Sequence, residues 1–101
     1  MTKAERNRMD REFSLKIRAR GECQWPECGK QPPAVQLQTA HIFSRRHLKL
    51  RWDEDNALCL CAKHHMAAHH DPLIFRDVVY GLLGPEKYQV LLDKRNSLEK
   101  P

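Results

Sequence analysis

Four side chains in the middle of the chain have the types and the spacing that hydrolysis of a phosphodiester needs. Asn56 lies fifteen residues after His41, and His65 and His69 lie nine and thirteen residues after Asn56. His65 and His69 are four residues apart in a segment of helical character, so their rings share one helix face and can bind one divalent cation. His41 is the candidate general base, because imidazole titrates near neutral pH and can accept a proton from an attacking water.

Three cysteines and a further histidine form a second candidate metal site. The pairs Cys23/Cys28 and Cys61/His64 lie on either side of the first predicted strand. Tetrahedral zinc accepts three thiolates and one imidazole, which predicts a structural zinc ion at these four residues. Cys59 lies two residues before Cys61, on the same side of a strand, and could compete as a ligand. Small buried thiols without a metal are the alternative.

The composition predicts one small domain over residues 1–101. A chain of this length buries a modest core and often needs a staple such as a metal. Four Cys and six His are many for 101 residues. No signal peptide, transmembrane run or transit sequence is recognisable, so we expect a cytoplasmic protein whose thiols stay reduced and bind metal.

The net charge of +5 is unevenly distributed along the chain. Residues 1–51 carry twelve Lys and Arg against five Asp and Glu, whereas residues 52–101 carry six against eight. A positive surface attracts a polyanion and releases condensed counterions on binding, which favours nucleic acid as the partner. Ordinary solvated surface charge is the alternative.

Local signals predict a small α+β fold. A capping box at Thr2 predicts an N-terminal basic helix with Met9, Phe13 and Ile17 on its apolar face. The next expected elements are strands over residues 35–43 and 57–60, joined by a polar connection over 44–56, and a helix over 63–70. Two C-terminal helices are expected over residues 72–83, capped by Asp71, and over 85–97.

The pattern of His41, Asn56, His65 and His69 resembles the HNH endonuclease motif, and the resemblance covers about residues 23–70. It implies a ββα-metal fold with His41 as the general base on the first strand, Asn56 before the second strand, and His65 and His69 as helix ligands of the metal. In that family the asparagine either orients the base or binds the metal, and both roles stay open for Asn56. The family commonly has Asp or His where this chain has Ala40, so water, substrate phosphate, Asn56 or His41 must complete the metal shell.

Residues 45–56 also resemble small phage or prophage HNH proteins, which often show an Arg-Trp-Asp-x-x-Asn run. The resemblance extends to a zinc knuckle, although four residues separate Cys23 from Cys28 and His64 replaces the usual last cysteine. Trp52 is expected to anchor the segment in the core. The basic side chains expected to contact DNA phosphates, with little reading of base sequence, are Arg45, Arg46, Lys49 and Arg51.

These patterns predict a DNA endonuclease that uses one divalent ion per chain, either Mn²⁺, Ni²⁺, Co²⁺, Zn²⁺ or Mg²⁺. We expect a monomer, or else a dimer, that nicks one strand per active site with low sequence specificity. The principal alternative is a non-catalytic zinc-dependent DNA-binding module, which explains the basic half and the knuckle but not the register of the four chemical residues. A metal-storage or sensing protein would leave the Arg-rich segment unexplained.

Overall fold

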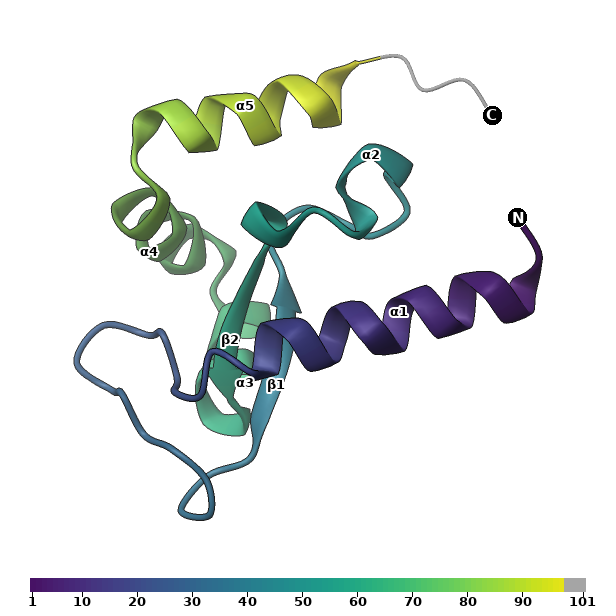
Figure 1. The fold of residues 1–101 in the computed structure, drawn as a ribbon. Helices are drawn as coiled ribbons and strands as arrows, with labels where there is room; N and C mark the ends of the chain where they lie inside the picture. Colours follow the sequence, from purple (N-terminus) through teal and green to yellow (C-terminus); the bar gives the residue numbers. More distant parts are fainter. Residues whose placement is uncertain (98–101) are drawn as a thin grey trace.

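A two-stranded antiparallel hairpin lies at the centre of the fold (Figure 1). The computed structural model describes residues 1–97, and within them β1 spans Leu37–His41 and β2 spans Ala57–Cys61. Both strands match the predicted segments within a few residues. His41 pairs with Ala57, so the last residue of β1 lies beside the first residue of β2. The hairpin therefore places the candidate base at one end of the sheet.

The N-terminal helix α1 (Lys3–Arg18) begins with the predicted capping box. The backbone N–H of Glu5 donates to the Thr2 hydroxyl over 3.1 Å, and the backbone N–H of Thr2 donates to the Glu5 carboxylate over 3.4 Å. These bonds satisfy amides that a helix start leaves without partners. Phe13 and Ile17 are buried, as their four-residue spacing predicts, and they attach α1 to the core.

Three helices follow the hairpin. α3 (Ala62–His70) continues directly from β2, and α4 (Pro72–Leu83) and α5 (Pro85–Asn96) complete the described chain. The Asp71 side chain caps α4, as predicted. Gly84 separates α4 from α5 at a φ of +84°, a conformation that glycine adopts without steric cost.

Helices α1 and α3 cover opposite faces of the hairpin. On β1, the Thr39 hydroxyl lies 3.0 Å from the Ser14 hydroxyl of α1. The neighbouring Gln38 is hydrogen-bonded instead to His65 of α3. Because consecutive strand side chains point to opposite faces, the sheet is held between the two helices, as Figure 1 shows.

The connection between the strands is more ordered than a polar loop. It contains the short helix α2 (Leu48–Arg51) and a single 3-10 turn, η1 (Glu54–Asn56). Leu50 and Asn56 are fully buried, and the Asn56 side chain donates to the Leu50 carbonyl over 3.1 Å. The polar connection expected over residues 44–56 therefore also contains two short helical elements, which one apolar and one amide side chain attach to the core.

The molecule is thus a small α+β globule with an N-terminal helix, a hairpin followed by a helix, and two C-terminal helices. Its core combines all of β2 with the inner faces of α1, α3 and α4. None of the helices within residues 1–97 has the length and hydropathy needed to cross a bilayer.

Candidate metal centre and catalytic cleft

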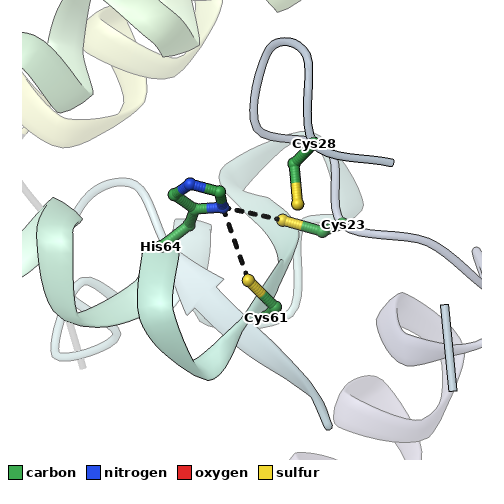
Figure 2. A group of neighbouring side chains, drawn as sticks. All are labelled: Cys23, Cys28, Cys61 and His64. Atoms are coloured by element: carbon green, nitrogen blue, oxygen red, sulfur yellow. Dashed lines mark hydrogen bonds between the residues drawn. The ribbon is translucent and has the colours of Figure 1, made fainter. Parts of the chain in front are cut away.

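Cys23, Cys28, Cys61 and His64 converge as predicted (Figure 2). Their ligand atoms all lie within 4.8 Å of one another. The His64 Nδ1 atom lies 3.5 Å from the Cys23 sulfur and 3.4 Å from the Cys61 sulfur. This set of three thiols and one imidazole could hold a zinc-like metal ion.

A tight turn brings the first two cysteines to this cluster. The Cys23 backbone N–H donates to the Lys30 carbonyl over 2.9 Å, and the Cys28 backbone N–H donates to the Trp25 carbonyl over 3.0 Å. The Trp25 ring stacks on His64 with centroids 5.0 Å apart and planes 2° apart. The turn therefore fixes both the sulfur atoms and the orientation of the imidazole.

The electrostatics of the cluster suit a bound cation. Burial raises the pKa of the Cys23 thiol to about 11, and hydrogen bonds from the Cys61 and Trp25 backbone offset only part of this effect. The hydrogen bond from the Lys30 backbone lowers the pKa of the Cys28 thiol. Burial lowers the pKa of His64, which keeps the imidazole neutral as a metal ligand must be. A divalent ion would supply the missing positive charge.

Cys59 is not part of this cluster. It is fully buried in β2, and its backbone exchanges two hydrogen bonds with Gln24, of 2.7 and 2.8 Å. Burial raises the pKa of its thiol. Cys59 is therefore a small core residue, and the competition with Cys61 that the strand spacing allowed does not occur.

His41, His65 and His69 line one cleft of about 680 Å³ along the outer side of β1. α1 forms one wall and α3 forms the other, and Arg45 lies at the same cleft. The three histidines come from parts of the chain that only the hairpin and α3 bring together. The structure thus places the predicted base and the predicted ligand pair at a common surface.

His41 is oriented by a main-chain carbonyl. Its Nε2 atom lies 3.3 Å from the Arg51 carbonyl oxygen. Because a carbonyl only accepts, Nε2 carries the proton in the neutral ring and Nδ1 carries the lone pair. Burial lowers the pKa of His41, and the nearby Arg45 charge acts in the same direction. His41 is therefore a neutral imidazole with an available basic nitrogen.

His65 and His69 are adjacent on α3, with ring centroids 5.0 Å apart. The His65 Nδ1 lies 2.7 Å from the Gln38 side-chain oxygen, so Nδ1 donates and Nε2 is left to bind a ligand. Burial lowers the pKa of His65, and the proximity of His69 and His41 lowers it further. Two imidazoles on one helical turn can bind one divalent cation.

The Asn56 side chain is bonded to the backbone on both of its polar atoms. Its side-chain oxygen accepts from the Phe43 backbone N–H over 2.9 Å, and its amide nitrogen donates to the Phe43 and Leu50 carbonyls over 3.0 and 3.1 Å. The side chain is fully buried and does not line the cleft. Of the two roles left open for Asn56, these contacts favour the one that fixes the backbone following His41.

Arg51, which was expected to contact DNA phosphates, forms an ion pair within the protein. Its guanidinium donates to both oxygens of Asp10 over 2.9 and 2.7 Å, and the Arg51 side chain is 14% exposed. Trp52 is half-buried against the core, and its indole N–H donates to the same carboxylate over 2.9 Å. The predicted anchoring role of Trp52 is confirmed, and Arg51 shares it.

The other predicted phosphate-binding residues are exposed near the start and middle of the connection. Arg45 lies at the cleft, and Arg46 follows it. The Lys49 ammonium donates to the Ser97 hydroxyl at the end of α5 over 2.9 Å. Of this group, Arg45 lines the same cleft as His41, and its charge lowers the pKa of His41.

Two residues of the site have no counterpart in the sequence motif. Asp10 lies on α1 and contacts residues 41 and 42 positions later, and Gln38 contacts His65 across 27 positions. The period-two pattern of β1 places Gln38 on the α3 face, and this is the signal that could have indicated it. Asp10 has no such local signal, because its partners are the last residue of a short helix that the sequence did not reveal and the residue after it.

Comparison of the chain with known protein families, with curated proteins and with solved structures returned no match.

Proposed function

We propose that this protein is a divalent-metal-dependent DNA endonuclease of HNH type, with a ββα-metal core formed by β1, β2 and α3. The observation that carries the proposal is the single cleft with His41 at the end of β1 and His65 and His69 on α3. One-metal phosphodiester hydrolysis requires a base and a set of metal ligands at one surface.

In this proposal His41 accepts the proton of a water molecule as the water attacks the phosphorus atom; the P–O bond to one sugar oxygen breaks, and the departing alkoxide takes a proton from solvent water. The bond from Nε2 to the Arg51 carbonyl leaves Nδ1 as the basic atom. Because burial lowers the pKa of His41, the basic form is present at neutral pH. A positioned general base of this kind contributes about 10²–10⁴-fold to a rate.

His65 and His69 would hold the divalent ion. The bond between the His65 Nδ1 and Gln38 fixes the ring and leaves Nε2 for coordination, an arrangement typical of metal-binding histidines. When bound, the ion supplies positive charge for the phosphoryl oxygens and the departing oxygen. Ala40 has no ligand atom and Asn56 is buried, so water and phosphate oxygens complete the ligand set.

A structural zinc ion in the Cys/His cluster supports the same site. The cluster joins the turn at Cys23 and Cys28 to Cys61 and His64, at the junction of β2 and α3. His65 immediately follows His64, so a metal at the cluster holds the first turn of the helix that carries both catalytic ligands. Zinc binding in such small domains contributes directly to the free energy of folding.

The substrate in this proposal is DNA, bound through its phosphates. The N-terminal half of the chain is strongly basic, and Arg45 lies at the cleft. Arg46 and Lys49 extend the positive charge along the connection. Contacts of this kind position the backbone and carry little sequence information.

Incubation of supercoiled plasmid with the purified protein and a series of metal ions tests the proposal. Imidazole ligands suit Mn²⁺ and Ni²⁺ better than the strongly hydrated Mg²⁺, so the first two should support cleavage at lower concentration. A chelator should stop the reaction. Binding of the plasmid without cleavage under every metal would contradict the proposal and indicate the non-catalytic DNA-binding module.

A further inference from the structure

The carbonyl that orients His41 belongs to a residue that α1 holds in place. The Asp10 carboxylate on α1 accepts two hydrogen bonds from the Arg51 guanidinium and one from the Trp52 indole. The side chains of Asp10 and Arg51 are only 24% and 14% exposed. A two-fold guanidinium–carboxylate contact fixes geometry as well as charge, so it restrains the backbone at Arg51.

The same helix contacts the His41 ring directly. Phe13 stacks on His41 with ring centroids 5.6 Å apart and planes 27° apart. Asp10 and Phe13 are three residues apart and therefore lie on one face of α1. That face contacts the imidazole plane through Phe13 and reaches its Nε2 atom through Asp10 and Arg51.

We infer that Asp10 is a positioning residue for His41. By holding Arg51 and Trp52, it fixes the carbonyl that keeps His41 protonated on Nε2 and leaves Nδ1 as the base. The role of His41 as a base rests on the proposed function, whereas its positioning does not. α1, which lies outside the ββα unit, is then a part of the catalytic apparatus.

Replacement of Asp10 leaves the other attachments of α1 intact. Phe13 and Ile17 remain buried in the core. Near the end of the helix, the Arg20 guanidinium donates to the Ala57 and Glu54 carbonyls over 2.9 and 2.8 Å. These contacts do not involve Asp10, so a change at this residue can alter the base without detaching the helix.

Nuclear magnetic resonance of the ring nitrogens of His41 in the wild type and in Asp10→Asn provides the direct test. The signals of His41 are identified by their loss in His41→Gln. The wild type should show a neutral ring protonated on Nε2, and Asp10→Asn should shift the ratio of the two tautomers toward that of free histidine. An unchanged ratio in Asp10→Asn would overturn the inference.

Kinetics provide a second readout that a merely structural role would not give. In Asp10→Asn, kcat should fall about 10–100-fold, because a supporting contact and not a substrate contact is lost, while KM for DNA does not rise. Asp10→Glu should restore part of kcat. Glu12→Gln is the matched control, since Glu12 is exposed on the same helix and its ion pair with Arg8 is long, at 3.9 Å. An equal loss in Glu12→Gln would contradict the inference.

The two proposals fail separately. If the wild type cleaves no DNA but Asp10→Asn changes the His41 tautomer ratio, the endonuclease function is wrong and the positioning holds. If the wild type cleaves DNA and Asp10→Asn neither slows cleavage nor changes the ratio, the positioning is wrong. Should Asp10→Asn fail to fold, Arg51→Lys replaces it, because lysine keeps the charge but cannot form the two-nitrogen contact.

Discussion

The surroundings of His41 determine how the proposed activity depends on pH. Burial lowers its pKa below the ordinary value of 6.5, and Arg45 adds to the effect. The basic form therefore persists as pH falls to 6.5, and it is lost only as pH falls through the lowered pKa. At saturating metal, kcat/KM should fall to half of its plateau only below pH 6.5. A decline centred above pH 7 would contradict the role of His41.

Asn56 should contribute to stability more than to metal binding. Asn56→Ala removes three hydrogen bonds; the Leu50 carbonyl keeps its bond from the Asp53 backbone N–H, but the half-buried N–H and carbonyl groups of Phe43 lose the partner they have in Asn56. Each such group costs about 1–3 kcal/mol, so the free energy of unfolding should fall by more than about 2 kcal/mol. Denaturant unfolding measures the loss. Asn7→Ala, at an exposed position of α1, is the control and should change the stability little.

If Asn56→Ala keeps its stability but binds the metal more weakly, then Asn56 is a metal ligand. The sequence alone left both roles open, because the spacing of Asn56 from His41 is the same in either case. The burial of the side chain favours the orienting role, and this burial depends on α2, which the sequence pattern did not indicate.

Other single residues show where sequence patterns suffice. His65 and His69 were predictable as a pair because four-residue spacing on a helix is a local property. Asp10 and Gln38 were not predicted, since their contacts join segments far apart in the chain. The assignment of Arg51 to phosphate binding used its charge and could not include the carboxylate that pairs with it.

At the scale of elements, the N-termini of helices that have capping side chains were predictable. Thr2 and Glu5 begin α1, and Asp71 begins α4, each through a short-range hydrogen bond. The four-residue helix α2 lacks a side-chain cap, and its burial of Leu50 requires the finished core. Local propensity cannot reveal an element of this kind, because isolated helices this short are not stable.

We expect the Cys/His cluster to need a bound metal in order to hold the turn at Cys23 and Cys28 against the junction of β2 and α3. Cys61→Ala removes a cluster ligand and should lower the bound zinc per chain and the helix signal in circular dichroism. Cys59→Ala is the control, because this neighbouring thiol lies outside the cluster and is equally buried. It should keep its zinc and lose only the stability expected of a small cavity.

Zinc loss in both cysteine variants, or in neither, would contradict this assignment. Strong chelation of the wild type gives an independent check. A protein that contains no zinc after chelation and still keeps its full helix signal would show that the cluster does not hold the fold together.

At the scale of the whole molecule, the charge distribution and the cleft lined by His41, His65 and His69 predict how DNA is cut. One base and one ligand pair can attack one strand at a time, so supercoiled plasmid should become open circles before linear product accumulates. Two nearby nicks, or a dimer with sites on opposite strands, would be needed for a double-strand break. Gels at successive times separate these products, and linear DNA as a first product would contradict a monomeric nickase.

The same nicking rate should fall steeply as salt rises from about 50 to 200 mM, because each phosphate contact releases counterions. Arg45 and Arg46 should set part of this dependence. A double substitution to glutamine should reduce the slope and leave the metal requirement unchanged. Equal slopes for the variant and the wild type would place the phosphate contacts elsewhere on the molecule.

Parallel measurement of plasmid cleavage and metal binding in His41→Ala and His65→Ala separates the base from the ligand pair. His41→Ala should lose about 10²–10⁴-fold in cleavage rate and bind Mn²⁺ as the wild type does, because a base acts on the transition state. His65→Ala should lose both cleavage and Mn²⁺ affinity, since it removes one of two imidazole ligands. If His41→Ala cleaves at the wild-type rate, or if His65→Ala keeps its Mn²⁺ affinity, then the cleft between α1 and α3 is not the metal-dependent nuclease site.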